Sequence, residues 1–299
     1  DSYNTKSEGY TKLLLRHMLS KDGYHSVRDS FAEKALRSLG VQNVLNTGCP
    51  TMWALTPEHC ASIPTSKASK VICTLTDYCR DEANDKAMLD ILLESYDHVY
   101  LWLQGREDPD YIRELGYADR VTLIPGTLAD YDAVLAQEDL DYVGTRLHAG
   151  IHALNHKIRS IILAVDNRAT EMGRDVNLPV IQRDEIGEEL EKKINSDFAS
   201  QIRIKQENID KFWNAFHAKY AEIILPQAEA YAVKVYGGEL SFGDKARVLA
   251  EIQVHLNHLS EADAATFNDV YGARRDAIIK ERTGGFFNDI KDAVNNAVD

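Results

Sequence analysis

The chain has 299 residues and is acidic, because 34 Lys and Arg face 47 Asp and Glu and give a net charge of −13. A generic nucleic-acid-binding protein needs a basic surface, so this balance disfavours that class. A content of 44% hydrophobic and 27% charged residues is typical of a globular protein, and no run approaches the roughly 20 apolar residues of a membrane span. The length accommodates two domains, or one large α/β domain with an appendage.

Residues 1–65 are predicted to be the C-terminal part of a first Rossmann-like domain whose beginning is absent, so the chain is expected to be a fragment or a processed product. Helix and strand patterns alternate along this segment, at 10–20, 25–28, 31–39 and 41–45. The sequence ASIPTSKAS at 61–69 is the expected linker to the next domain.

Residues 66–200 are predicted to form a second, complete Rossmann-like domain. Short apolar runs predict strands at 70–74, 98–103, 120–124, 140–143, 160–165 and 179–181. Helical periodicity lies between them, at 84–94, 109–115, 128–136, 146–156 and about 184–195. Strands of this length that alternate with helices indicate βαβ units and a parallel sheet whose strands are buried on both faces.

Residues 201–299 are predicted to form an α-helical appendage of three or four helices. Helical periodicity runs through most of this segment, and Gly237-Gly238 and Gly284-Gly285 interrupt it. The simplest interpretation of such an appendage is a device for docking or for assembly into a homo-oligomer.

The candidate catalytic element begins where the predicted strand 140–143 gives way to a helix. Arg146 and His148 lie there, beside the unpaired N–H groups and the positive end of the helix dipole, which suit a small anion. Arg146 can bind a carboxylate or phosphate with its planar fork, and His148 can act as a general acid or base. The alternative is that Arg146 caps an exposed turn and His148 is a hydrogen-bonded core residue.

His148, His152 and His156 are spaced four residues apart and therefore share one face of this helix. Two His at this spacing can bind zinc, but Ala149 stands where the H-E-x-x-H motif has Glu. The sequence offers no evident third ligand, so neither a metal nor another cofactor is expected.

Three further segments follow predicted strands and could contribute to the same site. Arg28 is a second candidate anion ligand, with Asp29 as its partner or as a helix cap. The loop that contains Cys49 is expected to shape the backbone near the site. Asp166-Asn167-Arg168 could hold a sugar or a ribose, or could be a helix cap with an exposed Arg.

The four cysteines, Cys49, Cys60, Cys73 and Cys79, form no C-x-x-C pair. In a chain of this size such usage is typical of reduced thiols and predicts a cytoplasmic protein. There is also no G-x-G-x-x-G, Walker A or G-x-S-x-G motif, which argues against classical dehydrogenases, P-loop enzymes and α/β-hydrolases.

Four short motifs in order resemble the polysaccharide pyruvyl transferase family over about residues 10–200. They are Ser26-Val27-Arg28-Asp29, Gly48-Cys49-Pro50, Tyr142-Val143-Gly144-Thr145-Arg146-Leu147-His148 and Asp166-Asn167-Arg168. The resemblance implies a glycosyltransferase-B-like (GT-B-like) architecture. It also implies transfer of a pyruvyl group from phosphoenolpyruvate to a sugar of a bacterial cell-surface polysaccharide, as a ketal, with release of phosphate.

By position in these motifs, the resemblance implies that His148 is catalytic and that the substrates contact Arg28, Thr145, Arg146, Leu147, Asn167 and Arg168. The implied partners are phosphoenolpyruvate and a glycan or lipid-linked sugar, handled in the cytoplasm or at the inner face of the membrane. The family's first domain carries a Gly-rich loop that this chain lacks, and the helical appendage is not part of the family pattern. Two other functions stay open: a GT-B-type glycosyltransferase that uses a nucleotide sugar, and a non-catalytic interaction protein.

Overall fold

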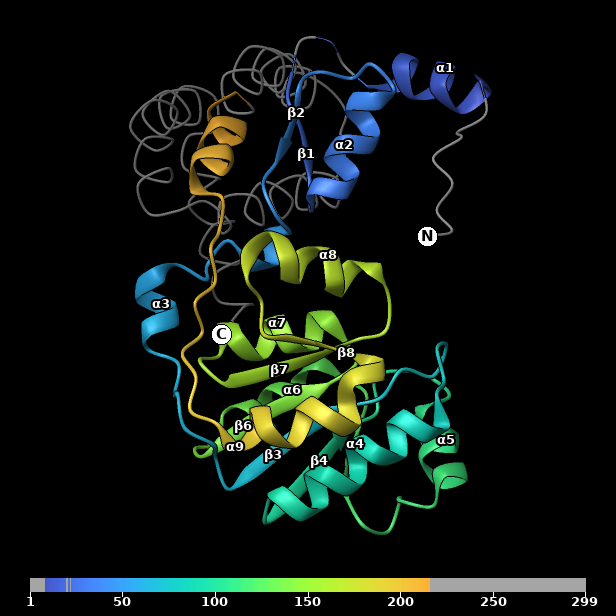
Figure 1. Ribbon diagram of the computed structural model, residues 1–299, viewed down its shortest axis with the longest axis vertical. Helices are drawn as coiled ribbons and strands as arrows, with labels where there is room; N and C mark the ends of the chain where they lie inside the picture. The colour runs from blue at the N-terminus through green and yellow to red at the C-terminus, as the bar shows by residue number, and fades with distance from the viewer. Residues whose placement is uncertain (1–8, 20, 22, 216–299) are drawn as a thin grey trace, which may run out of the picture. The chain divides into compact units, whose positions relative to one another are not determined.

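The computed structural model describes residues 9–19, 21 and 23–215 (Figure 1). The chain divides into two compact units, Asp1–Ala221 and Glu222–Asp299. The helical appendage predicted for 201–299 lies outside the described residues beyond residue 215, and 206–215 form a helix. Among the described helices, none combines the length and the apolar character that crossing a bilayer requires.

The first part of the chain forms a parallel pair of short strands, β1 (His25–Val27) and β2 (Val44–Asn46), joined through α2 (Ser30–Ser38). Helix α1 (Gly9–Met18) precedes them, and a 3-10 turn, η1 (Pro50–Met52), and α3 (Pro57–Ala61) follow. Strand β2 begins later than predicted because α2 ends with a left-handed Gly40 (φ 88°), after which the Val41 N–H bonds to the Leu36 carbonyl. This C-terminal cap uses residues that the sequence pattern assigned to the strand.

The main sheet has six parallel strands in the order β5-β4-β3-β6-β7-β8. Their bounds are β3 (Lys70–Thr74), β4 (His98–Trp102), β5 (Thr122–Ile124), β6 (Leu140–Gly144), β7 (Arg159–Ala164) and β8 (Val180–Gln182). Numbered along the chain from β3, this is the 3-2-1-4-5-6 order of a doubly wound Rossmann fold. The predicted α/β, Rossmann-like class is therefore confirmed, and the strand order reverses between β3 and β6.

Helices cover both faces of this sheet (Figure 1). One hydrophobic cluster contains residues of α6 (Leu128–Leu135), α7 (Leu147–Asn155) and α8 (Asn167–Val176). The other contains residues of α4 (Glu82–Ser95), α5 (Asp108–Leu115) and α9 (Glu191–Asn195). The fold is thus a sheet with a separate apolar core on each face, as expected for strands buried on both sides.

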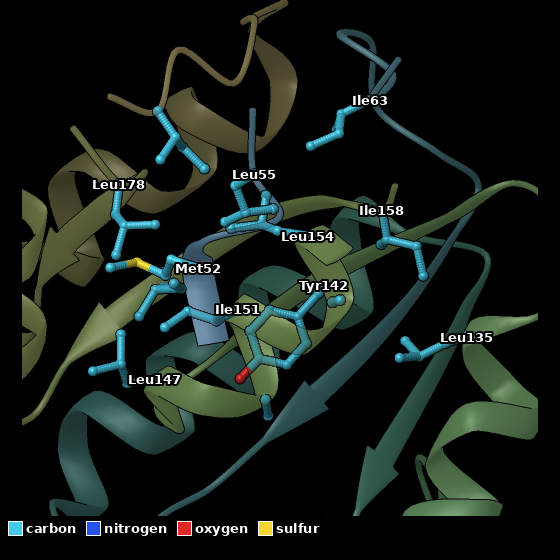
Figure 2. Packing of buried hydrophobic residues seen from close by; sticks show 14 of the residues in the cluster. Met52, Leu55, Ile63, Leu135, Tyr142, Leu147, Ile151, Leu154, Ile158 and Leu178 are labelled. Carbon is cyan, nitrogen blue, oxygen red and sulfur yellow. The ribbon is translucent and has the colours of Figure 1, made fainter. Parts of the chain in front are cut away.

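Helix α7 packs closely on the sheet and brings its N-terminus to the edge where β6 ends. A Cβ atom at Gly150 would collide with Ile162 and Tyr142, so only glycine permits this approach. Ile151 and Leu154 of α7 pack into the first cluster together with Met52 of η1 (Figure 2).

Helix α8 connects the two sheets; the sequence pattern offered its cap at Asp166 as one alternative but predicted no helix after it. Its Asp175 accepts hydrogen bonds from the Ser30 N–H at 2.5 Å and from Asn46 Nδ2 at 2.8 Å. The helix predicted at about 184–195 is also more irregular than expected, because a 3-10 turn (η2, Arg183–Glu185) and a π-helical turn (η3, Ile186–Leu190) precede α9. Unlike these elements, β3 has the bounds that its apolar run predicts.

Candidate functional site

The candidate site lies where β3 and β6 end side by side, at the reversal of strand order. In open α/β sheets, ligands bind in the crevice at this point, beyond the carboxyl ends of the strands. Thr145, just after β6, is buried; its N–H bonds to the Thr74 carbonyl at 3.1 Å and its hydroxyl lies 2.8 Å from that of Thr76. These contacts hold the loop before α7 against the loop after β3.

Arg146 follows Thr145 and is held by protein groups on two of its nitrogens. Its Nε donates to the Leu75 carbonyl at 2.7 Å, and its Nη2 donates to Asp77 at 3.0 Å and to Asp108 at 2.9 Å. A Cβ at Gly105 would meet both Asp77 and Arg146, so this close arrangement also requires glycine. No hydrogen bond of Nη1 is found among the described residues, and Nη1 is the donor left for a ligand.

Asp108 is 1% exposed, and Asp77 and Arg146 are 14% and 13% exposed. Burial raises the pKa of Asp108, against the effects of the Gly105 N–H and of Arg146. For Asp77, burial acts in the same direction, but hydrogen bonds from Glu107 and Arg146 outweigh it and lower the pKa. The two carboxylates therefore orient Arg146 and offset its charge, a role that the sequence analysis did not predict.

His148 occupies the first turn of α7, and its side chain is exposed. No described side chain caps the N-terminus of this helix. The imidazole is thus accessible at a helix end whose N–H groups and dipole favour an anion. The alternative interpretation, a buried core histidine, is wrong.

Cys49 lies beside His148 and comes from the loop after β2. The Cys49 Sγ is 3.6 Å from His148 Nε2, and the Thr51 hydroxyl donates to it at 3.1 Å. Burial alone raises the pKa of the Cys49 thiol, but the hydrogen bonds from His148 and Thr51 outweigh burial and lower the pKa to about 7. The loop that was expected only to shape the backbone therefore also places a thiol with a lowered pKa beside His148.

We expect alkylation of Cys49 by iodoacetamide to reach half its maximal rate near pH 7, because the thiolate is the nucleophile. Replacing His148 by alanine removes the stabilising hydrogen bond and should move this midpoint upward, toward that of an ordinary thiol. The rate is measured by mass spectrometry on the peptide that contains Cys49, with the peptide of the half-buried Cys79 as the internal control. A midpoint that is the same with and without His148 would contradict this assignment.

Asp166 and Arg168 lie at the start of α8, close to the Arg146 loop. The Asp166 side chain caps α8 by accepting from the Arg168 N–H at 2.9 Å, and it also accepts from Arg168 Nε at 2.8 Å. Arg168 Nη2 donates to the Tyr78 hydroxyl at 3.1 Å, and the Asp166 hydrogen bonds raise the pKa of Arg168. Asp166 is therefore a helix cap that fixes Arg168 beside the site.

A cavity of about 160 Å³ joins these groups. It is lined by Tyr78, Gln104, Thr145, Arg146, Leu147, His148, Ala149, Val165, Asp166, Arg168 and Ala169. Five of the predicted site residues thus surround one space, whereas Arg28 and Asn167 do not line it. Arg28 pairs with Asp29 at 2.9 Å, and Asp29 also caps α2, so both of the expected roles of Asp29 are present.

Two of the lining residues, Leu147 and Thr145, do not present a free polar side-chain group to the cavity. The Leu147 side chain is buried in the core under α7 and offers a ligand no polar group. The Thr145 hydroxyl is used to bond the loop after β3. Both residues shape the site, while Arg146, His148 and Arg168 offer the polar groups.

The histidines at the other end of α7 have a neighbour that the sequence did not reveal. Asp132 of α6 lies beside His152 and His156 and is a candidate third ligand that the sequence did not make evident. His148 does not belong to that cluster of three.

Fold and site together define a Rossmann-like α/β protein with an arginine- and histidine-lined cavity at the reversal of its strand order. A sequence profile of the polysaccharide pyruvyl transferase family matches residues 2–167, and the chain belongs to this family. No curated protein matches the chain.

Among solved structures, the UDP-GlcNAc 2-epimerase of Methanocaldococcus jannaschii, determined in complex with UDP-GlcNAc and UDP, resembles the chain at 11% identity with a TM-score of 0.42. The likeness covers 66% of this chain, and the chain spans 61% of the epimerase.

Proposed function

We propose that this protein transfers a pyruvyl group from phosphoenolpyruvate to a sugar of a cell-surface polysaccharide and forms a cyclic ketal. The observation that carries the proposal is the exposed His148 on a cavity that Arg146 and Arg168 also line, within a chain that belongs to the pyruvyl transferase family. A glycan or a lipid-linked sugar is the acceptor that this function requires.

The donor carries a phosphate and a carboxylate, and the cavity offers groups suited to both. The N–H groups at the start of α7 favour an anion, and a guanidinium binds planar or tetrahedral oxyanions with charge-assisted hydrogen bonds. Asp77 and Asp108 hold Arg146 in one orientation, so little side-chain freedom is lost when the donor binds. Arg28 lies outside this cavity and is kept as a donor ligand only by the family resemblance.

The reaction needs proton transfers that one histidine can carry. A proton adds to the methylene carbon of the donor, one sugar hydroxyl bonds to the neighbouring carbon, and the second hydroxyl bonds there as phosphate leaves. Of the two hydroxyl protons, one balances the new methyl group and the other leaves with the phosphate. His148 is the group placed to move a proton here, and Cys49 contacts its Nε2 and helps to fix the ring.

Binding of phosphoenolpyruvate, measured by calorimetry, tests the proposed binding site of the donor. We expect Arg146→Lys and Arg168→Ala each to weaken binding by roughly tenfold to a hundredfold, since a charge-assisted hydrogen bond contributes about 1.5–3 kcal/mol. Lysine is chosen at Arg146 because it keeps a positive charge beside the buried Asp108 but loses the planar fork. Arg113→Ala is the matched control, because this exposed arginine of α5 does not line the cavity.

Wild-type affinity in both site variants would overturn the placement of the donor. Binding of a nucleoside diphosphate in place of phosphoenolpyruvate would favour the nucleotide-sugar glycosyltransferase. If neither ligand binds, the interaction-protein hypothesis takes precedence. Assembly through residues 201–299 and the cytoplasmic location stay predictions.

A further inference from the structure

Helices α6 and α7 bring one carboxylate and two imidazoles together at the C-terminal end of α7, the opposite end of this helix from the transferase site. Asp132 lies in α6, His152 lies in the last turn of α7, and His156 is the residue that ends this helix. Asp132 Oδ1 is 2.6 Å from His152 Nε2 and 3.7 Å from His156 Nε2. The two rings lie 4.6 Å apart between centroids, as their spacing of four residues predicts.

These groups lie close to the ligand positions of a small ion. Nitrogen and oxygen ligands lie about 2.0–2.2 Å from zinc, and two such ligands in a tetrahedral site are therefore about 3.3 Å apart. The separations from Asp132 Oδ1 lie on either side of this value, so His152 must move outward from its hydrogen-bond distance when an ion enters, and all three ligand atoms lie within 4.8 Å of one another. An ion would replace the proton that Asp132 and His152 share.

The backbone around the three groups is fixed by buried contacts. Tyr131, the neighbour of Asp132, stacks on Trp102 with ring centroids 4.1 Å apart. Its hydroxyl donates to the Ala149 carbonyl of α7 at 3.0 Å. Because Tyr131 is buried and joins α6 to α7, the two helices hold their ligands at a set separation before any ion binds.

The three side chains themselves are partly open to water. Asp132, His152 and His156 have exposed fractions of 42%, 33% and 37%. An ion can thus enter, and water can complete its coordination. Two imidazoles with one carboxylate suit zinc and other late divalent transition metals, whereas magnesium and calcium prefer oxygen ligands alone.

We propose that Asp132, His152 and His156 form a zinc site with water as the remaining ligand. His148 and His156 are eight residues apart, which is about 12 Å along a helix, so the ion lies away from the transferase site. Its expected role is structural: it ties the C-terminal end of α7 to α6.

Calorimetric titration of the full chain with zinc in metal-free buffer tests this site, together with the visible absorption of bound cobalt. We expect His152→Ala and His156→Ala each to weaken zinc binding by about a hundredfold or more, since loss even of groups that merely support metal ligands costs 10–100-fold. Magnesium should not compete. Zinc should raise the melting temperature of the wild type and not of the His152→Ala/His156→Ala double variant.

Cys49→Ser/His148→Ala is the matched control, because this pair also joins a soft ligand to an imidazole on α7. This variant should keep wild-type zinc affinity. Loss of zinc binding in it, with unchanged affinity in the His152→Ala/His156→Ala variant, would move the ion to the transferase site and overturn the proposal. Circular dichroism of the variants shows whether a loss reflects unfolding, and Asp132→Asn, which keeps the shape of the side chain, should weaken binding in a folded chain. Absence of zinc binding by the wild type would equally overturn it.

Discussion

Replacing His148 by alanine is expected to lower pyruvyl transfer by about 10²–10⁴-fold, the range for loss of a general acid or base. His148 is exposed on the cavity, and its side chain is not needed for the core beneath α7. The variant should therefore fold and should still bind phosphoenolpyruvate within a few-fold of wild type. Transfer is followed as phosphate release with hexosides that present two neighbouring free hydroxyl groups.

Two further variants separate proton transfer from other effects of His148. His148→Gln keeps a polar side chain of similar reach but cannot accept and return a proton, so it should be nearly as slow as His148→Ala. His98→Ala is the control, because His98 is the exposed first residue of β4, at the opposite end of the strands from the site, where it hydrogen-bonds to Thr122 and packs against Tyr100. Full turnover by His148→Gln would show that the imidazole does not carry the proton.

The parts of the fold that the sequence predicts are those in which local pattern and burial agree. The run KVICT becomes β3 with the same bounds, because a strand buried on both faces is apolar throughout. Helix α8 was missed because its apolar residues form only a narrow stripe, Ala169, Met172 and Val176, in an otherwise polar segment. Its buried face becomes recognisable only once the sheet it covers is known.

The site likewise combines residues of one local motif, which the sequence identifies, with partners that are distant in the sequence. Arg146 and His148 lie two residues apart in one short motif, so the sequence alone identifies both as candidate site residues. Their partners come from other loops and from the start of α5: Asp77 is 69 residues away from Arg146, Asp108 is 38 away, and Cys49 is 99 away from His148. Asp77 could have been found from its place just after a predicted parallel strand, whereas no local signal links Cys49 to His148.

The largest effect on stability is expected at a buried ion pair between the neighbouring strands β6 and β7. Arg159 and Asp141 are 1% and 2% exposed, and Arg159 Nη1 donates to Asp141 at 2.6 Å. The Tyr96 hydroxyl also donates to Asp141, at 2.8 Å, and Arg159 Nη2 donates to the carbonyls at the end of α9. Burial raises the pKa of Asp141, against the opposing effects of Arg159 and of the Tyr96 hydrogen bond.

In a buried ion pair, removing one partner costs more stability than the intact pair contributes, because the other charge stays buried without compensation. Asp141→Ala leaves a buried guanidinium without its counter-charge and should lower the free energy of unfolding by about 3–5 kcal/mol. Arg159→Met should be comparably destabilising, because it isolates Asp141 and frees the α9 carbonyls. Urea unfolding of both variants and of the double variant gives the coupling between the two sites, and the double variant should cost less than the sum of the single ones.

An exposed ion pair provides the control for this cycle. Arg113 and Asp110 of α5 are 65% and 64% exposed, so Arg113→Ala should change stability by less than about 1 kcal/mol. If the effects of Asp141→Ala and Arg159→Met simply add, the two charges do not act as a pair. If they couple as expected, we infer that the pair acts more on how β6, β7 and the end of α9 are positioned than on net stability. A buried charge is costly unless it meets its partner, so an arrangement that separates Asp141 from Arg159 is disfavoured.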